Sequence, residues 1–427
     1  LASVIYSYCS RHAVSKKIFR NNIMKKNVTF FADFGSKNRP YTGGYYFAEC
    51  LLGILRKLDI NLTIFSAVIP KIDKDTALIK GDNIIEIKLP IGGFGNPFVG
   101  LKWAFQLRKK LKKMPKQDLY IFDQPMTLVN ILPKAPAVAM FHGSDFVKLK
   151  DLSISHPRDF FYSIFWRKMF LNKINKKFLT KEIGIPLFNS NDTLNRLSAD
   201  FTLDPRPLEQ YVTHLPVDTD KFKRDNNERN KIREYYKIAD DEILIVALSN
   251  FDLIKRADRL SSIVLKILKS SQTDKVKFLL IGGGRISKPI DDLIENPDFL
   301  KNIIRIKEVS HNDVYKYYSA ADIALSASER ESFGYFIAEG MSTELPFVAY
   351  RGGAIEEVIQ NNTTGFVVDS EDEFLESLQK LLNDNSLRLK MGEVGRERVI
   401  KMFSMEIFKN RLLDIIKEEF NINLSSK

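Results

Sequence analysis

The sequence contains little cysteine and no long hydrophobic run. Its 427 residues include two cysteines, Cys9 and Cys50, which excludes a disulfide scaffold and favours a reducing cytosol. No apolar stretch approaches the roughly 18 residues that a membrane-spanning helix needs. Hydrophobic residues make up 44% and charged residues 28% of the chain, the mixture of an ordinary globular protein. The length is sufficient for two domains with large cores.

Clusters of metal-binding residues are also absent from the sequence. No pair of histidines with a carboxylate, and no group of cysteines, stands at ligand spacing. We therefore expect neither a metal site nor another resident cofactor.

The first residues do not resemble a secretory signal, because residues 1–23 are basic and lack a long apolar stretch. The chain begins with Leu, and Met24 lies three residues before a predicted strand. We expect residues 1–23 to be a mis-assigned or dispensable extension.

Positive charge is in excess: Lys and Arg outnumber Asp and Glu by 65 to 53, a net charge of +12. Such an excess favours anionic partners, namely nucleic acid, acidic lipid or phosphorylated substrates. We expect no nucleic-acid partner, since no known binding module is recognisable.

Part of the charge lies in residues 158–181, where apolar residues have helical spacing. This segment is either a helix packed on a sheet with a basic solvated face, or an interfacial helix that binds acidic headgroups.

Strand-like runs alternate with helical patterns along most of the chain, which predicts parallel sheets covered by helices on both faces. Irregular, charged chain between residues 201 and 236 separates two series of strands. The predicted strands are 27–34, 60–69, 118–124, 135–142 and 184–190 in the first series, and 242–249, 277–284, 302–309, 322–328, 346–350 and 365–369 in the second. The sequence thus predicts an α/β fold of two doubly wound, Rossmann-like domains, in which ligands bind at the carboxyl ends of strands.

One such strand end carries the sequence ERESFGYFIAEGMS, residues 329–342. We expect a helix to begin near Phe333, where Gly334 lets the backbone approach a ligand. Amide groups at a helix start favour an anion such as a diphosphate. Glu331 and Glu339 could each accept hydrogen bonds from a diol, which favours a nucleotide sugar. An acid that stabilises the helix dipole, followed by an unrelated glutamate, would give the same pattern.

The wider stretch 326–369 resembles the nucleotide-sugar motif of glycosyltransferase family 4. That motif has a glutamate, Phe-Gly, a second glutamate eight positions on, Pro-Val-Val-Ala, Gly-Gly, a glutamate and Thr-Gly-Phe. The residues in step with it are Glu331, Phe333, Gly334, Glu339, Pro346, Gly352, Gly353, Glu357, Thr364, Gly365 and Phe366. Two residues depart from it: Gly340 stands where alanine is usual, and Glu344 where glycine is usual.

Three other segments extend the resemblance from about residue 27 to the last helix. ALSNFDLIKRADRL is similar to the segment that binds the donor diphosphate, with Asn250, Lys255 and Arg256 at the relevant positions; the asparagine replaces one expected cation. YTGGYYFAECLLGIL and FHGSDF are similar to N-domain loops. The residues that these loops contribute are Gly43 and Gly44 for phosphate or acceptor, and His142 for the donor sugar or transition state. Asp145 either orients His142 or caps the next turn.

The resemblance implies a GT-B fold, with an acceptor-side domain at 24–217, a donor-binding domain at 218–400 and a helix at 401–427 crossing back. The two domains would face each other across a cleft. It implies retaining transfer of a hexose-type sugar from a UDP-, GDP- or ADP-linked donor to a glycan or lipid-linked hydroxyl. The expected location is the cytoplasm, including the inner face of the membrane.

In that reading Lys255 and the backbone from Ser332 to Tyr335 hold the diphosphate, Glu331 the sugar and Glu339 the ribose. A phosphorylase of the same fold, a catalytically silent nucleotide-sugar-binding protein and, more remotely, a nucleic-acid binder remain as alternatives.

Overall fold

The computed structural model describes residues 25–32, 43–68, 83–88, 113–123, 134–143, 172–251, 253–270, 275–284 and 287–426. The expected extension at 1–23 and Asp145 lie outside the described residues. So does the basic segment before residue 172.

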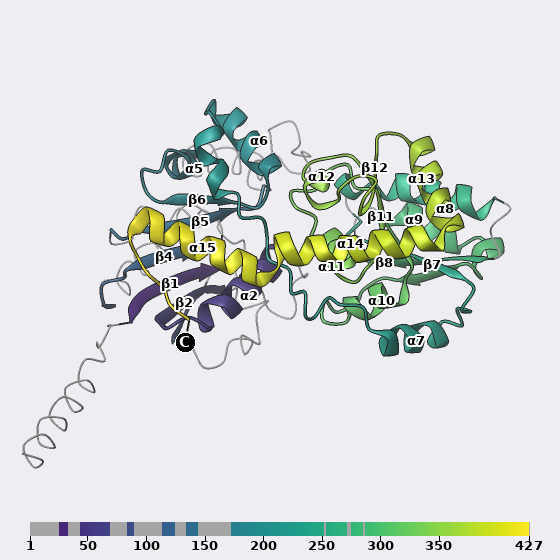
Figure 1. Cartoon of the computed structure of the whole chain (residues 1–427), viewed down its shortest axis with the longest axis horizontal. Helices are drawn as coiled ribbons and strands as arrows, with labels where there is room; N and C mark the ends of the chain where they lie inside the picture. The colour runs from purple at the N-terminus through teal and green to yellow at the C-terminus, as the bar shows by residue number, and fades with distance from the viewer. Residues whose placement is uncertain are drawn as a thin grey trace, which may run out of the picture.

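The first described sheet lies in the N-terminal half of the chain (Figure 1). Its strands are β1 (Lys26–Ala32), β2 (Ile60–Val68), β3 (Asn83–Lys88), β4 (Leu119–Phe122), β5 (Ala137–Phe141) and β6 (Ile185–Phe188). They pair in parallel in the order β3-β2-β1-β4-β5-β6. This is the order of a doubly wound Rossmann sheet. The predicted strands of the first series all form, and β3 is an additional edge strand that the sequence analysis did not include.

The second described sheet repeats the same topology. Its strands are β7 (Ile243–Leu248), β8 (Val276–Ile281), β9 (Ile303–Ile306), β10 (Ile323–Ser326), β11 (Phe347–Tyr350) and β12 (Gly365–Val368). They are parallel, in the order β12-β11-β10-β7-β8-β9. The expectation of two doubly wound α/β domains is therefore confirmed.

The strands of the second sheet, apart from β9 at its edge, are mostly buried on both faces because helices cover both. Along β7, Leu244 and Val246 belong to one apolar cluster, and Ile245 and Ala247 to the other. Successive side chains of a strand point to opposite faces, so these clusters are the two sides of the sheet. The first cluster continues into the N-terminal domain and includes Phe408 and Leu412 of the last helix.

The helices begin at residues that can cap them. Ser190, Asp225, Ser370, Asp384 and Ser404 each accept a hydrogen bond from an amide in the first turn of the helix that follows. The described helices are α2 (Gly43–Arg56), α5 (Asn172–Leu179), α6 (Asn191–Phe201), α7 (Asn226–Tyr235), α8 (Ala257–Leu268), α9 (Lys288–Ile294), α10 (Val314–Ala320), α11 (Tyr335–Ser342), α12 (Ile355–Val358), α13 (Glu371–Asn383), α14 (Asn385–Phe403) and α15 (Met405–Phe420). Short 3-10 turns lie at Arg206–Tyr211, Leu253–Lys255 and Pro297–Phe299.

The chain crosses between the domains twice, and the two crossings touch. The amide of Val217 donates to the carbonyl of Phe403 at 2.7 Å, and Val217 forms a β-bridge with Ser404. Figure 1 shows α14 and α15, in yellow, running from the second domain to the first. Helix α15 packs on α2, where the rings of Phe408 and Phe47 meet edge to face. We refer to the paired segments 214–217 and 403–404 as the hinge.

The two departures from the family motif have local explanations. A methyl group on Gly340 would stand 2.7 Å from the ring of Phe347, so the glycine makes room for a phenylalanine where the motif has valine. Glu344 has φ 66°, the left-handed conformation that glycine adopts most easily. The turn forms nonetheless, with the Glu344 amide donating to the Met341 carbonyl.

Candidate active site

The loops that follow β7 and β10 meet at the centre of the second sheet. These strands are neighbours, and the chain winds away from them in opposite directions, which is the switch point where doubly wound sheets bind ligands. The loop after β7 carries Asn250 and Lys255, and the loop after β10 carries Glu331. The structure thus brings two sequence-predicted segments to one place.

Lys255 and Glu331 form a close ion pair at this point. The Lys255 ammonium lies 2.6 Å from one carboxylate oxygen of Glu331 and 2.7 Å from the other. It also lies 5.5 Å from the centre of the Phe336 ring. The Glu331 side chain is 8% exposed and that of Lys255 25% exposed. Each residue was predicted separately as a ligand contact; their pairing was not.

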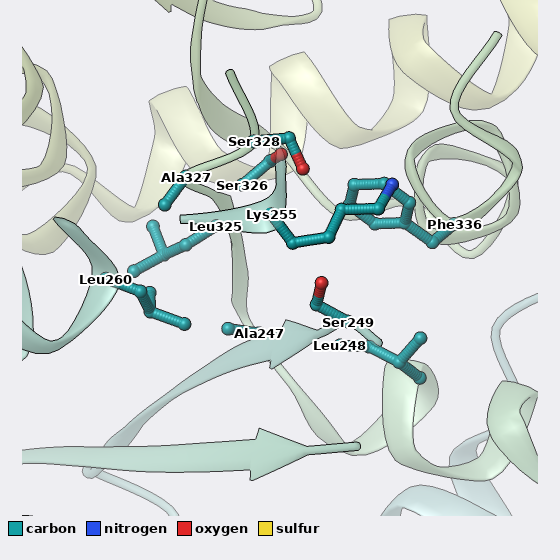
Figure 2. A pocket seen from close by; sticks show the side chains of 10 residues that line it. All are labelled: Ala247, Leu248, Ser249, Lys255, Leu260, Leu325, Ser326, Ala327, Ser328 and Phe336. Atoms are coloured by element: carbon teal, nitrogen blue, oxygen red, sulfur yellow. The ribbon is translucent and has the colours of Figure 1, made fainter. Parts of the chain in front are cut away.

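Serine hydroxyls and Lys255 line a small cavity (Figure 2). The cavity has a volume of about 10 Å³, room for roughly one water molecule. The hydroxyls of Ser249 and Ser326 are buried there without a hydrogen-bond partner among the described residues. The site therefore offers free hydroxyl donors next to an ammonium group. Its lining residues are Ala247, Leu248, Ser249, Lys255, Leu260, Leu325, Ser326, Ala327, Ser328 and Phe336.

The glycine loop 282–284, which follows β8, packs against the loop that carries Asn250. The amide of Phe251 donates to the carbonyl of Gly283 at 2.8 Å. Gly282 has φ 122°, and a Cβ atom there would stand 1.8 Å from the Ser249 carbonyl oxygen; one on Gly284 would stand 2.4 Å from that of Phe251. Only glycine allows the two loops to approach this closely.

Helix α11 begins at the loop that carries Glu331. Gly334 caps it with φ 89°, and Phe333 is buried directly before it. The start of α2 and the loop after β5, both in the N-terminal domain, lie against this point. A Cβ atom on Gly43 would stand 3.3 Å from the Tyr335 ring, and one on Gly143 would stand 3.0 Å from the Ser332 Cβ. The predicted Gly43 is thus close to the donor motif, whereas the Cα of Gly44 faces open space.

Glu339 is buried and bonded to a histidine that the sequence analysis did not single out. The His311 Nε2 lies 2.7 Å from a Glu339 oxygen, and its Nδ1 lies 3.4 Å from the Lys221 ammonium. Because an ammonium can only donate, Nδ1 accepts and Nε2–H donates to Glu339. The ring of Tyr46, from the N-terminal domain, lies 4.5 Å from that of His311. Burial and the charge of Glu339 contribute to raising the Tyr46 pKa well above its ordinary value.

His142 follows β5, as predicted, and its orienting partner is Asp123. The imidazole Nε2 lies 2.8 Å from the Asp123 carbonyl oxygen and 3.1 Å from a carboxylate oxygen of the same residue. Both partners are acceptors, so Nε2 carries the proton. Asp123 directly follows β4 and is 4% exposed. The sequence analysis did not single it out, although it lies at the carboxyl end of the predicted strand 118–124.

The remaining predicted residues are placed as follows. Arg256 pairs with Asp258 at 2.7 Å and with Glu329 at 3.4 Å, and these acids raise the pKa of its guanidinium. The positive charge of Arg256 is therefore paired with two carboxylates of its own domain. Asn250 is exposed in the loop between β7 and Lys255. Across the described ranges, no three His, Cys, Asp or Glu side chains are arranged to hold a metal ion.

The sequence of residues 228–398 matches the family model described as Glycosyl transferases group 1. Three relatives are each similar to slightly less than half of this chain. The N-acetyl-alpha-D-glucosaminyl L-malate synthase of Bacillus anthracis is 29% identical over 206 residues, 47% of this chain and 52% of the relative. The capsular polysaccharide glycosyltransferase CapM of Staphylococcus aureus is 32% identical over 204 residues, 46% of this chain and 51% of the relative.

The third relative is a GDP-mannose-dependent mannosyltransferase of Mycobacterium tuberculosis, which acts on a phosphatidylinositol monomannoside according to its name. It is 25% identical over 217 residues, 48% of this chain and 56% of the relative. The chain thus spans about half the length of the curated relatives it matches.

Solved structures extend the likeness in fold to nearly the whole chain. A glycosyltransferase from Rickettsia africae aligns with a TM-score of 0.66 and 21% identity, over 92% of this chain and 98% of the other. Anabaena HepE, solved with UDP and glucose, aligns with a TM-score of 0.65 and 13% identity, over 92% and 99%. The fold is therefore that of the GT-B glycosyltransferases, and the C-terminal half of the chain is similar in sequence to the group 1 glycosyl transferases.

Proposed function

We propose that this protein is a retaining glycosyltransferase of family 4. It would transfer a hexose-type sugar from a nucleoside diphosphate to a hydroxyl of a glycan or lipid-linked acceptor. The observation that carries the proposal is the pairing of Lys255 with Glu331 at the switch point of the second sheet. In this proposal Lys255 binds the diphosphate, and Glu331 beside it holds sugar hydroxyls.

The surroundings of the pair support a diphosphate ligand. The start of α11 and the buried hydroxyls of Ser249 and Ser326 supply hydrogen-bond donors within the same loops. A diphosphate that binds Lys255 would release Glu331 from it. The freed carboxylate can then accept hydrogen bonds from the sugar, and Glu339, held by His311, from the ribose.

The chemistry that suits this site breaks the bond between the sugar C1 and the diphosphate oxygen, and the electron pair leaves with the diphosphate. The acceptor oxygen forms the new bond to C1 on the same face, and its proton passes to the departing diphosphate oxygen. Preorganised donors such as Lys255 stabilise the leaving group, and the oxocarbenium-like transition state needs no enzyme nucleophile. His142, held by Asp123, would contact the donor sugar or the transition state from the N-terminal domain, which is the proposed acceptor side.

For the nucleotide base, the sugar and the acceptor, we propose chemical classes and not single compounds. The names of the relatives include GDP-mannose as a donor and a phosphatidylinositol mannoside as an acceptor, and HepE was solved with UDP. We keep UDP-, GDP- and ADP-linked hexoses as candidate donors. The proposed mechanism includes no resident metal, so Lys255 and the amino-terminal ends of helices offset the negative charge of the diphosphate.

A lipid-linked acceptor would bring the protein to the inner face of a membrane. None of the described helices has the length and apolar character needed to span one. In α5, Ile174 and Phe178 are buried, whereas Lys173 and Lys176 are exposed. This part of the basic segment therefore packs on the domain and presents only its charge, so any membrane contact through it would be electrostatic.

The experiment is an assay of nucleoside diphosphate release with a panel of UDP-, GDP- and ADP-sugars, with and without glycan and lipid-linked acceptors. We expect release that requires an acceptor, with the configuration at C1 kept in the product. A demand for inorganic phosphate would instead indicate a phosphorylase. Binding without turnover would indicate a silent binding protein. A steep salt-dependent affinity for DNA or RNA would favour a nucleic-acid binder.

A further inference from the structure

Glu357 belongs to the family motif but has no role in the site described above. It lies on α12 of the second domain, yet its carboxylate binds the first domain. One oxygen accepts from the backbone amide of Asn191 at 2.8 Å and from its side-chain amide at 2.9 Å. The other accepts from the Asp192 amide at 2.9 Å. The imidazole of His214, in the hinge, lies 3.2 Å from the first oxygen.

These amides begin helix α6, which makes the contact favourable. The first four amides of a helix have no partner within it, and they carry the positive end of its dipole. Ser190 caps the amide of Thr193. Glu357 takes two of the remaining amides, so a carboxylate from the other domain completes the cap. Hydrogen bonds to a charged acceptor are about twice as strong as neutral ones.

A second interdomain contact lies beside the first and next to the donor loop. Arg330, which precedes Glu331, donates to the carboxylate of Asp192 at 2.7 Å. Close to it, Gly143 of the His142 loop packs against Ser332. The start of α6 therefore contacts the same loop that carries the donor-binding carboxylate.

The Glu357 backbone is itself held in place. Arg398 of α14 donates to the carbonyl of Glu357 at 2.8 Å and to that of Val358 at 2.9 Å. The contact between Glu357 and α6 thus joins the domains in addition to the β-bridge between Val217 and Ser404 in the hinge.

We propose that Glu357 is a positioning residue that latches the N-terminal domain closed against the donor loop by capping α6. The latch brings the acceptor-side loop of His142 to the donor sugar without touching the donor. Its effect on catalysis rests on the proposed function, whereas its effect on closure does not.

The test uses the whole chain and four variants. Glu357→Ala removes the carboxylate and Glu357→Gln removes its charge. Asn191→Pro removes both donors of residue 191 from the other side; proline is tolerated at the first position of a helix, and the extended backbone of Ser190 is compatible with a following proline. Glu356→Gln is the matched control, because Glu356 is exposed on the same helix and pairs with Arg351 of its own domain.

Three quantities are measured: the radius of gyration by small-angle X-ray scattering without ligand, the Kd for the preferred nucleoside diphosphate, and kcat. We expect the Glu357 variants and Asn191→Pro to be more extended than the wild type. Their Kd for the nucleoside diphosphate should stay within twofold, while kcat falls at least tenfold. Glu356→Gln should behave as the wild type in all three.

The proposal is overturned if the Glu357 variants remain as compact as the wild type, or if they lose nucleotide binding as much as turnover. A wild type without transferase activity would defeat the proposed function alone, since scattering still decides whether the latch exists. Should Glu357→Ala fail to fold, Glu357→Gln and Asn191→Pro carry the same comparison.

Discussion

The ammonium group of Lys255 lies between the two carboxylate oxygens of Glu331, 2.6 and 2.7 Å away. The structure therefore has an internal anion at the position proposed for the donor diphosphate. A bound diphosphate must compete with this carboxylate for the same cation. Under the proposed function, the pair sets the affinity of the site and links the group proposed to hold the sugar to the group proposed to bind the phosphate.

From this pair we predict that Glu331→Gln separates binding from transfer. Without the competing charge, the variant should bind a nucleoside diphosphate about tenfold more tightly, since about 1.4 kcal/mol corresponds to one factor of ten. The rate of sugar transfer should fall because the carboxylate that accepts hydrogen bonds from the donor sugar is gone. Calorimetric titration and turnover measure the two effects. The control is Glu329→Gln, an exposed acid two residues earlier. Weaker diphosphate binding by Glu331→Gln would contradict the competition.

His311 should act through Glu339 on the nucleotide. His311→Ala removes the 2.7 Å hydrogen bond and leaves a buried carboxylate without that donor, so it should weaken binding of the nucleoside diphosphate by about 1.5–3 kcal/mol. His311→Gln keeps an N–H donor and should recover part of the loss. Titration of both variants with a nucleoside diphosphate, and with inorganic diphosphate as the control, separates a ribose effect from a phosphate effect. Equal losses for both ligands would count against a role at the ribose.

Gly340 and Phe347 should be energetically coupled. Gly340→Ala places a methyl group 2.7 Å from the Phe347 ring and should destabilise the fold by about 1–3 kcal/mol. Phe347→Val leaves a cavity beside Gly340 and is destabilising by itself. In the double variant the new methyl occupies part of that cavity, so the loss should be smaller than the sum. Denaturant unfolding of the three variants gives the coupling energy. If the two single losses of unfolding free energy simply add up in the double variant, the methyl group does not fill the cavity and the prediction is wrong.

Acid should weaken the Glu357 latch. Burial raises the pKa of Glu357, but hydrogen bonds from His214 and from the Asn191 and Asp192 amides outweigh it and leave the pKa below the ordinary 4.5. The group therefore adds stability above pH 4.5 and loses it as the pH falls through the lowered pKa. We predict that the difference in Tm between the wild type and Glu357→Gln is full at pH 7 and shrinks below pH 4.5. A difference that grows with acid would contradict this sign.

The sequence predicted the strands best where they are buried on both faces. Runs such as ILIVAL in β7 are continuous and apolar, a pattern that few other elements produce. Edge strand β3, NIIEIK, carries polar and charged residues and was missed. The polar helix α7 was described only as a charged stretch. It is anchored by Arg229 and Arg233, which pair with Asp322 at 2.8 and 3.2 Å, a tertiary contact that helical periodicity does not reveal.

The site was predictable where its residues lie in one motif or follow predicted strands. Glu331, Glu339 and Lys255 were found in this way. His311 and Asp123 were overlooked, although they lie at the carboxyl ends of the predicted strands 302–309 and 118–124, because their partners 28 and 19 residues away form no recognisable motif with them. The partners of Glu357 lie 143 to 166 residues from it, on the other domain. Spacing along the chain carries no signal for such contacts; only the closure of the two domains brings them together.

The central claim is that Lys255 binds the diphosphate of a nucleotide sugar. The most direct measurement is the shift in Tm of the wild type and of Lys255→Met across a panel of uridine, guanosine and adenosine diphosphates and their sugars. The control is Lys266→Met, an exposed lysine paired with Glu371 on the same domain. We predict that at least one nucleotide family raises the Tm of the wild type and of the control, and that Lys255→Met abolishes or strongly reduces this shift. An unchanged shift in Lys255→Met, or no shift in the wild type with any member of the panel, would contradict the account.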